Sequence, residues 1–188
     1  RPAAIAGLTA MAGAHAAMVG VMVMTPVHLG HGGATLQIIG VVISVHIAGM
    51  YALSPVMGVL TDRWGPQRTI LLGVGILLAA LFSAAASGEH QHVQVGVALT
   101  LLGLGWSACM VAGSSLLSGS VPDDVRTRVQ GVGDLVMGMT AASAGALAGP
   151  VLDAAGYSML SLVAIGLLVP IVLLVLRSLI TVAPAPSR

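Results

Sequence analysis

Long apolar runs alternate with short polar or glycine-rich breaks along this chain. The runs cover residues 3–29, 34–60, 69–87, 93–117, 123–152 and 158–180. Each run is close to the roughly 20 mostly apolar residues that a helix needs to cross the hydrocarbon core of a bilayer. The pattern predicts an all-α membrane protein with six transmembrane helices, which together form a single domain over residues 1–188.

The breaks contain residues that end or begin helices. Three glycines between positions 30 and 33 end the first predicted helix, and a charged segment at residues 58–68 ends the second. Pro122, Asp123 and Asp124 begin the fifth. Proline fits the first turn of a helix, and acidic side chains favour the positive end of the helix dipole. These signals support the same helix ends as the apolar runs.

The composition excludes a soluble domain. Of the 188 residues, 57% are hydrophobic and only 7% are charged, whereas about a quarter of the residues of a soluble domain are charged. The chain has no lysine and a net charge of +1, which gives no indication of a nucleic-acid partner. Its one cysteine, Cys109, excludes an internal disulfide and a cysteine-only metal site. Because the chain opens on Arg1 rather than Met, we expect a fragment or a processed form.

The arginines indicate the orientation in the membrane. With six helices, the two termini and the connections after the second and fourth helices lie on one side. Those segments hold all seven arginines of the chain, which are Arg1, Arg63, Arg68, Arg126, Arg128, Arg177 and Arg188. The opposite connections hold histidines and acidic residues but no arginine. By the positive-inside rule we expect both termini to be cytoplasmic, in a cell (inner) membrane.

The segment at residues 58–68 combines two glycines with charged residues at fixed spacing. It reads Gly58-x-x-x-Asp62-Arg63-x-Gly65-x-x-Arg68. We expect Gly58 to allow close helix packing, Gly65 to form a tight turn, and Asp62 to pair with an arginine or cap a neighbouring helix. An ordinary charged turn is the alternative. The spacing, between a second and a third spanning helix, resembles the signature loop of the major facilitator superfamily, although Pro66 and Gln67 stand where that family often has a basic residue.

This resemblance implies a permease, a secondary active transporter that moves a small solute by alternating access. Such proteins have two six-helix halves, each built from inverted three-helix repeats, and this chain would be one half. A second six-helix half, fused, separate or a second copy, would complete the cavity, and the signature loop would latch its inward gate. Segments 21–26, 103–106 and 128–134 resemble the C-terminal half. Segment 145–150 faintly resembles the antiporter motif of N-terminal halves, but Asp153 replaces a glycine of that motif.

Three ionisable residues lie at membrane depth, where each is a candidate functional residue. His15 and His46 fall near the middle of the first and second predicted helices, and Asp134 lies on the fifth. Asp134 is a candidate carrier of a coupling proton. The alternative is a structural hydrogen bond to a neighbouring helix through the gap left by Gly131 and Gly133.

Methionines share helix faces with these histidines. Met11, His15, Met18 and Met22 follow helical spacing, as do His46 and Met50. Thioether and imidazole groups suit Cu(I), although a methionine stripe also serves as adaptable core. Met18-x-x-x-Met22 and His46-x-x-x-Met50 resemble motifs of the copper-importing branch of the superfamily. A substrate or metal site would therefore use Met18, Met22, His46, Met50 and His15.

Other functions remain as alternatives. One is proton-coupled efflux of small organic molecules, with Asp134 as the proton carrier. Another is a membrane scaffold that transports nothing, or a partial transporter half. An intramembrane enzyme would need Ser114 or Ser115 paired with His46, together with an oriented base and an oxyanion site. We expect no enzyme activity, no cofactor and no nucleic-acid partner; the expected partners are the lipid bilayer, a small-molecule or metal-ion substrate and the second half.

Overall fold

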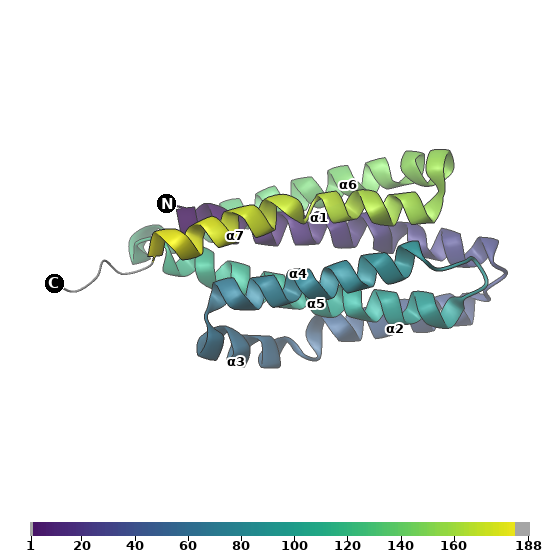
Figure 1. Cartoon of the computed structure of the whole chain (residues 1–188), viewed down its shortest axis with the longest axis horizontal. Coiled ribbons are helices and arrows are strands. Elements are labelled where there is room, and N and C mark those ends of the chain that lie inside the picture. Colours follow the sequence, from purple (N-terminus) through teal and green to yellow (C-terminus); the bar gives the residue numbers. More distant parts are fainter. Residues whose placement is uncertain (1, 183–188) are drawn as a thin grey trace.

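The computed structural model describes residues 2–182, and side chains through residue 180. All regular structure in this part of the chain is helical. The helices are α1 (Pro2–His31), α2 (Leu36–Tyr51), α3 (Ser54–Trp64), α4 (Pro66–Ala85), α5 (His92–Gly119), α6 (Asp123–Gly166) and α7 (Val169–Val182). They pack into an elongated bundle in which the chain runs back and forth along the long axis (Figure 1).

The two ends of the bundle differ in charge. The start of α1, the α3–α4 and α5–α6 junctions and the end of α7 lie together at one end (Figure 1, left). Arg63, Arg68, Arg126 and Arg128 belong to these two junctions. The α1–α2 and α4–α5 connections lie at the other end (Figure 1, right) and hold no arginine. The arginines of the two junctions therefore gather at one end of the bundle.

Five stretches of the described chain are long and apolar enough to cross a membrane. They are Pro2–His31, Leu36–Trp64, Pro66–Ala85, His92–Gly119 and Asp123–Ile180. The last stretch has 58 residues and joins two of the six predicted runs. It includes Gly156, whose φ of 80° and ψ of 173° are not helical. The chain folds back on itself in this region (Figure 1).

The second predicted helix, at residues 34–60, is not continuous. The structure has two helices instead, and α2 ends at Tyr51 while α3 begins at Ser54. Pro55 causes the break because it has no N–H to offer the carbonyl of Tyr51 four residues earlier. The hydroxyl of Ser54 donates to that carbonyl instead, at 2.9 Å.

The signature loop is also more helical than the sequence indicated. The charged residues of segment 58–68 lie in helices on either side of a one-residue turn, because α3 continues to Trp64 and α4 begins at Pro66. Gly65 alone separates the two helices, with a φ of 86° and a ψ of 152°. The tight turn expected at Gly65 is therefore confirmed. A second break, at residues 167–168, separates α6 from α7 inside the run predicted at 158–180.

Helix α5 packs against three neighbouring helices through glycines. A Cβ added at Gly103 would lie 2.5 Å from the carbonyl oxygen of His46 on α2. One added at Gly105 would lie 2.8 Å from the carbonyl oxygen of Gly73 on α4, and Gly113 meets α1 equally closely. These spaces admit no side chain. Close approach of backbones through small residues is the usual way in which helices associate in lipid.

Burial is uneven around the bundle. In the most apolar window of each span, 61% of the residues are buried in α1 and in α5, but only 22% in Leu36–Trp64 and 33% in Asp123–Ile180. The exposed side chains on these outer helices include large apolar ones, among them Val41, Val45, Ile47, Leu135 and Leu147. We call the exposed faces of α2, α3 and α6 the open flanks. The two most buried helices, α1 and α5, therefore pack against helices whose outer faces are not covered by any other described helix.

Candidate functional site

A histidine and a tryptophan from distant parts of the chain meet at the middle of α1. The indole Nε1 of Trp106 donates a hydrogen bond to Nδ1 of His15 at 2.8 Å. The two ring centroids are 5.8 Å apart, with an angle of 42° between the planes. Because an indole N–H can only donate, Nδ1 of His15 carries no proton in this pair. The neutral imidazole then carries its proton on Nε2.

Tyr51 extends this pair to α2. Its ring lies 5.9 Å from that of Trp106 at 75°, an edge-to-face contact. Trp106 is only 8% exposed, whereas Tyr51 is 61% exposed. We call His15, Tyr51 and Trp106 the aromatic cluster. It holds two of the five Trp, Tyr and Phe side chains of the chain, and it links α1, α2 and α5 from the core outward.

His46 joins α2 to α5. It is fully buried, and its Nδ1 lies 2.7 Å from the carbonyl oxygen of Leu99. A carbonyl can only accept, so Nδ1 is the donor. Nε2 is buried and has no hydrogen-bond partner among the described residues. The contact with α5 makes His46 a link between two helices.

The methionines of the predicted metal site are core residues. Met18 and Met50 are buried in the main apolar cluster, and Met22 packs against it. Met50 lies against α5, where a Cβ added at Gly103 would be 3.2 Å from its Cγ. Met11, on the same stripe, similarly lies against Gly113. Among the described residues, no group of three or more His, Cys, Asp and Glu side chains is placed to hold a metal ion. The structure gives copper binding no support.

Asp134 and the charged residues of the signature loop are exposed. Asp134 lies on α6 and makes no hydrogen bond or ion pair with another described residue. Of the two glycines expected to leave a gap, Gly133 packs against Leu117, whereas a Cβ added at Gly131 would meet no described atom within 4 Å. The alternative of a structural hydrogen bond is therefore not observed within the described part of the chain.

The signature loop presents its charges away from the bundle. Asp62, Arg63 and Arg68 are exposed. A Cβ added at Gly58 would meet no described atom within 4 Å. The close helix packing expected at Gly58 is thus absent from the described chain, because the open side of this glycine faces outward. Any close approach to Gly58 must come from another segment or chain.

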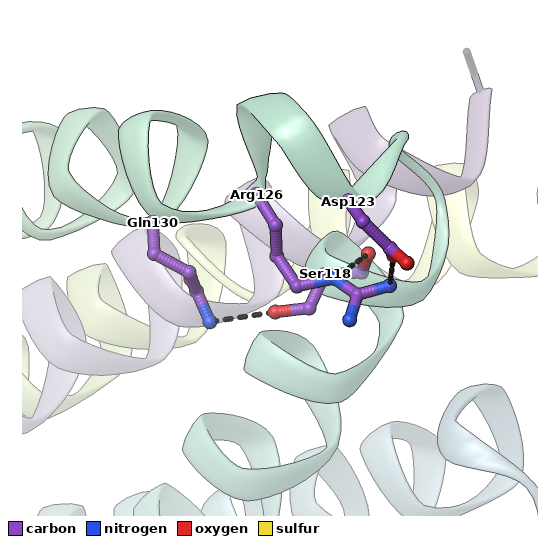
Figure 2. Close-up of polar contacts among 4 residues, drawn as sticks. All are labelled: Ser118, Asp123, Arg126 and Gln130. Carbon is purple, nitrogen blue, oxygen red and sulfur yellow. Dashed lines mark hydrogen bonds and ion pairs between the residues drawn. The ribbon is translucent and has the colours of Figure 1, made fainter.

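A polar network ties the start of α6 to the end of α5 (Figure 2). Nε2 of Gln130 donates to the hydroxyls of Ser114 and Ser118, at 2.5 and 2.8 Å. Arg126 donates to the carbonyl of Ser118 at 3.2 Å and pairs with Asp123 at 2.5 Å. Ser114 is therefore engaged with Gln130, while His46 bonds to Leu99. Neither Ser114 nor Ser115 bonds to His46 in the described chain, because Nδ1 of His46 is bonded to Leu99 and its Nε2 has no partner.

A third group of polar residues stands at the opposite end of the bundle. The hydroxyls of Thr25 and Tyr157 are 2.8 Å apart. The ring of His28 stacks on that of Tyr157, with centroids 4.1 Å apart and an angle of 10°. Tyr157 directly follows Gly156, where the chain folds back. These contacts fix the returning segment against the end of α1.

Comparison with known proteins identifies the class of protein to which this helical bundle belongs. The Major Facilitator Superfamily profile matches residues 5–188. The chain belongs to this superfamily, and the resemblance of the signature loop is confirmed at that level. It is therefore an integral membrane protein of a transporter family rather than of an enzyme family.

Three curated relatives are similar to most of the chain. The uncharacterized MFS-type transporter YdeG of Bacillus subtilis is 41% identical over 160 residues, which are 85% of this chain and 37% of the relative. The uncharacterized MFS-type transporter YddS of the same organism is 38% identical, over 83% of this chain and 36% of its own length. The riboflavin transporter RfnT of Brucella anthropi is 28% identical, over 88% of this chain and 40% of its own length. The chain thus spans well under half the length of the relatives that it matches.

Proposed function

We propose that this chain forms one six-helix half of a secondary active transporter that carries a small organic solute across a cell membrane by alternating access. The observation that carries this proposal is the aromatic cluster. It places polar ring atoms at the middle of the most buried helices and ends on an exposed tyrosine. Polar groups at membrane depth are expensive unless they face a cavity or a partner.

The open flanks support a second half. They expose large apolar side chains on α2 and α6, which flank the buried pair α1 and α5. The relatives have more than twice the length of the matched segment. We propose that this chain is the C-terminal half and that it has six spans, the fifth and sixth of which are separated at Gly156. The second half would cover the open flanks. The arginine-bearing end and both termini would then lie on the cytoplasmic side of the inner membrane.

The solute is proposed to be organic rather than a metal ion. The methionines expected to bind copper pack in the core, and the relative RfnT is described as a riboflavin transporter. Asp134 is the proposed proton carrier, because it is the carboxylate closest to mid-membrane depth in the sequence and faces away from the described bundle. On this proposal the signature loop, with Gly58, Asp62, Arg63, Gly65 and Arg68, gates the cytoplasmic side.

Reconstitution tests the proposal. The full-length protein that contains this chain is placed in liposomes, and riboflavin movement is followed with and without an imposed proton gradient. We expect gradient-driven accumulation above that of protein-free liposomes. Asp134→Asn should abolish the gradient-driven part while riboflavin exchange between the two sides continues. Equal riboflavin movement in protein-containing and protein-free liposomes would refute transport of this solute. Unchanged gradient dependence in Asp134→Asn would refute its role as proton carrier.

A further inference from the structure

We infer that the aromatic cluster is the solute-binding surface and that it takes a flat, uncharged, aromatic solute with a carbonyl acceptor on its ring. This inference rests on the proposed transport function and names the substrate class of the same site. Three features support it: an exposed aromatic ring, a hydrogen-bond donor that contacts the same tryptophan as that ring, and the absence of charged residues on α1, α2 and α5.

The exposed ring is that of Tyr51. Trp106 contacts it from one side and is itself held by His15, so the orientation of Tyr51 is supported from the core. Its hydroxyl makes no hydrogen bond to a described residue, and the ring is 61% exposed. Tyrosines that face lipid concentrate at the membrane interface, where the hydroxyl can reach water. Tyr51 contacts Trp106, which bonds to the middle of α1, so its exposed ring lies far from either interface and is open to contact with a solute.

The donor is Nε2 of His15. Because Nδ1 accepts the bond from Trp106, the ring proton of the neutral imidazole is on Nε2. His15 is only half-buried, and Nε2 is not among the buried atoms without a partner. This N–H is therefore accessible at the edge of the cluster. A ring carbonyl of a solute stacked on Tyr51 would be a suitable acceptor.

The absence of charged residues on the neighbouring helices favours a neutral solute. α1, α2 and α5 contain no Asp, Glu, Lys or Arg among their described residues. An ionic solute at the cluster would be desolvated with no counter-charge from these helices, which costs several kcal/mol. The side chains that accompany the cluster are small or apolar, such as Ala14, Met18 and Leu102. They offer little to a sugar, which needs many hydrogen bonds.

The experiment measures binding separately from transport. The full-length protein is placed in lipid nanodiscs, and equilibrium dialysis is used with two flat carbonyl-bearing probes, lumichrome and caffeine, and with ribitol as a non-aromatic control. We expect at least one aromatic probe to bind and ribitol not to bind. Tyr51→Ala should weaken binding by about 5- to 150-fold, the range that loss of one stacking contact gives. Tyr51→Phe should keep most of the affinity because it keeps the ring.

A matched control uses the other exposed aromatic side chain of the same span. Trp64, at the end of α3, is 55% exposed and lies outside the cluster, so Trp64→Ala should leave binding unchanged. Three results would overturn the inference: neither probe binds more tightly than ribitol, Tyr51→Ala binds as the parent protein does, or Trp64→Ala loses as much affinity as Tyr51→Ala. Binding that depends on Tyr51 without transport in liposomes would instead refute the proposed transport and leave the site in place.

Discussion

Replacement of Gly103 by alanine tests the packing that positions α2 and its half of the aromatic cluster. The added Cβ would lie 2.5 Å from the carbonyl oxygen of His46 and 3.0 Å from the backbone nitrogen of Met50. Both neighbours are backbone atoms, so no side-chain rotation relieves the contact. We therefore expect Gly103→Ala to push α2 away from α5.

The size of the effect follows from the distances. A shift of about 0.9 Å would bring the closest pair from 2.5 Å to the 3.4 Å at which ordinary van der Waals contact begins. The same shift along the 2.7 Å bond from His46 to Leu99 would stretch it beyond hydrogen-bond range. Overpacking costs about 1–3 kcal/mol, and a buried polar group left without its partner costs about 1–3 kcal/mol. We expect a total loss of about 2–6 kcal/mol.

Thermal unfolding of the full-length protein in one detergent provides the assay. Gly75→Ala is the matched control, since Gly75 is exposed on α4 and a Cβ there meets no described atom within 4 Å. It should melt at or slightly above the parent, because alanine is a better helix former by about 0.5–1 kcal/mol. In a His46→Leu background, Gly103→Ala should cost less, because the bond to Leu99 is already lost. Equal melting of Gly103→Ala and Gly75→Ala would refute the close packing of α2 on α5.

Two further changes test the turns of the chain. Gly65→Ala should destabilise the protein by about 1–3 kcal/mol, because Gly65 has a φ of 86° and a ψ of 152°, a region that only glycine adopts readily. The melting temperature of Gly65→Ala is compared with that of Gly58→Ala, which we expect to melt close to the parent protein. Tyr157→Phe should cost about 1 kcal/mol through loss of the hydroxyl contact with Thr25. Tyr157→Phe keeps the ring that stacks on His28, whereas Tyr157→Ala removes it. Tyr157→Ala should therefore unfold at a clearly lower temperature than Tyr157→Phe, and equal melting temperatures would contradict a role for stacking.

Much of the helical architecture could be predicted from the sequence because its signals are local. The apolar runs gave the spanning stretches, and Gly65 was correctly expected to turn the chain. The break of the second helix was missed even though its signal was present. Pro55 lies inside an apolar run, and hydropathy does not register the loss of one N–H. Weighting Ser54 and Pro55 as a stop signal would have found the break.

The candidate site was harder to predict because it depends on helix rotation. Helical spacing showed that His15 and the methionines lie close together on α1, but it did not show which neighbour each of them meets. Met18 is buried in the core, and His15 meets Trp106, which is 91 residues away in sequence. Tyr51 was not singled out although it lies inside the run predicted at residues 34–60, because only ionisable residues and methionines were taken as candidates at membrane depth. Its place next to Trp106 depends on how closely α2 approaches α5 at Gly103, which no local pattern reveals.

The break between α2 and α3 divides the second span into two helical segments that need not move together. The first segment, α2, is fixed to α5 by the bond from His46 and by the glycine contact at Gly103. The second segment, α3, carries Asp62 and Arg63 and begins after the break at residues 52–53. In a continuous rod, a force on Asp62 would displace His46 by leverage. With the break, we expect that force to turn α3 about residues 52–53, next to Tyr51, while α2 keeps its contacts with α5.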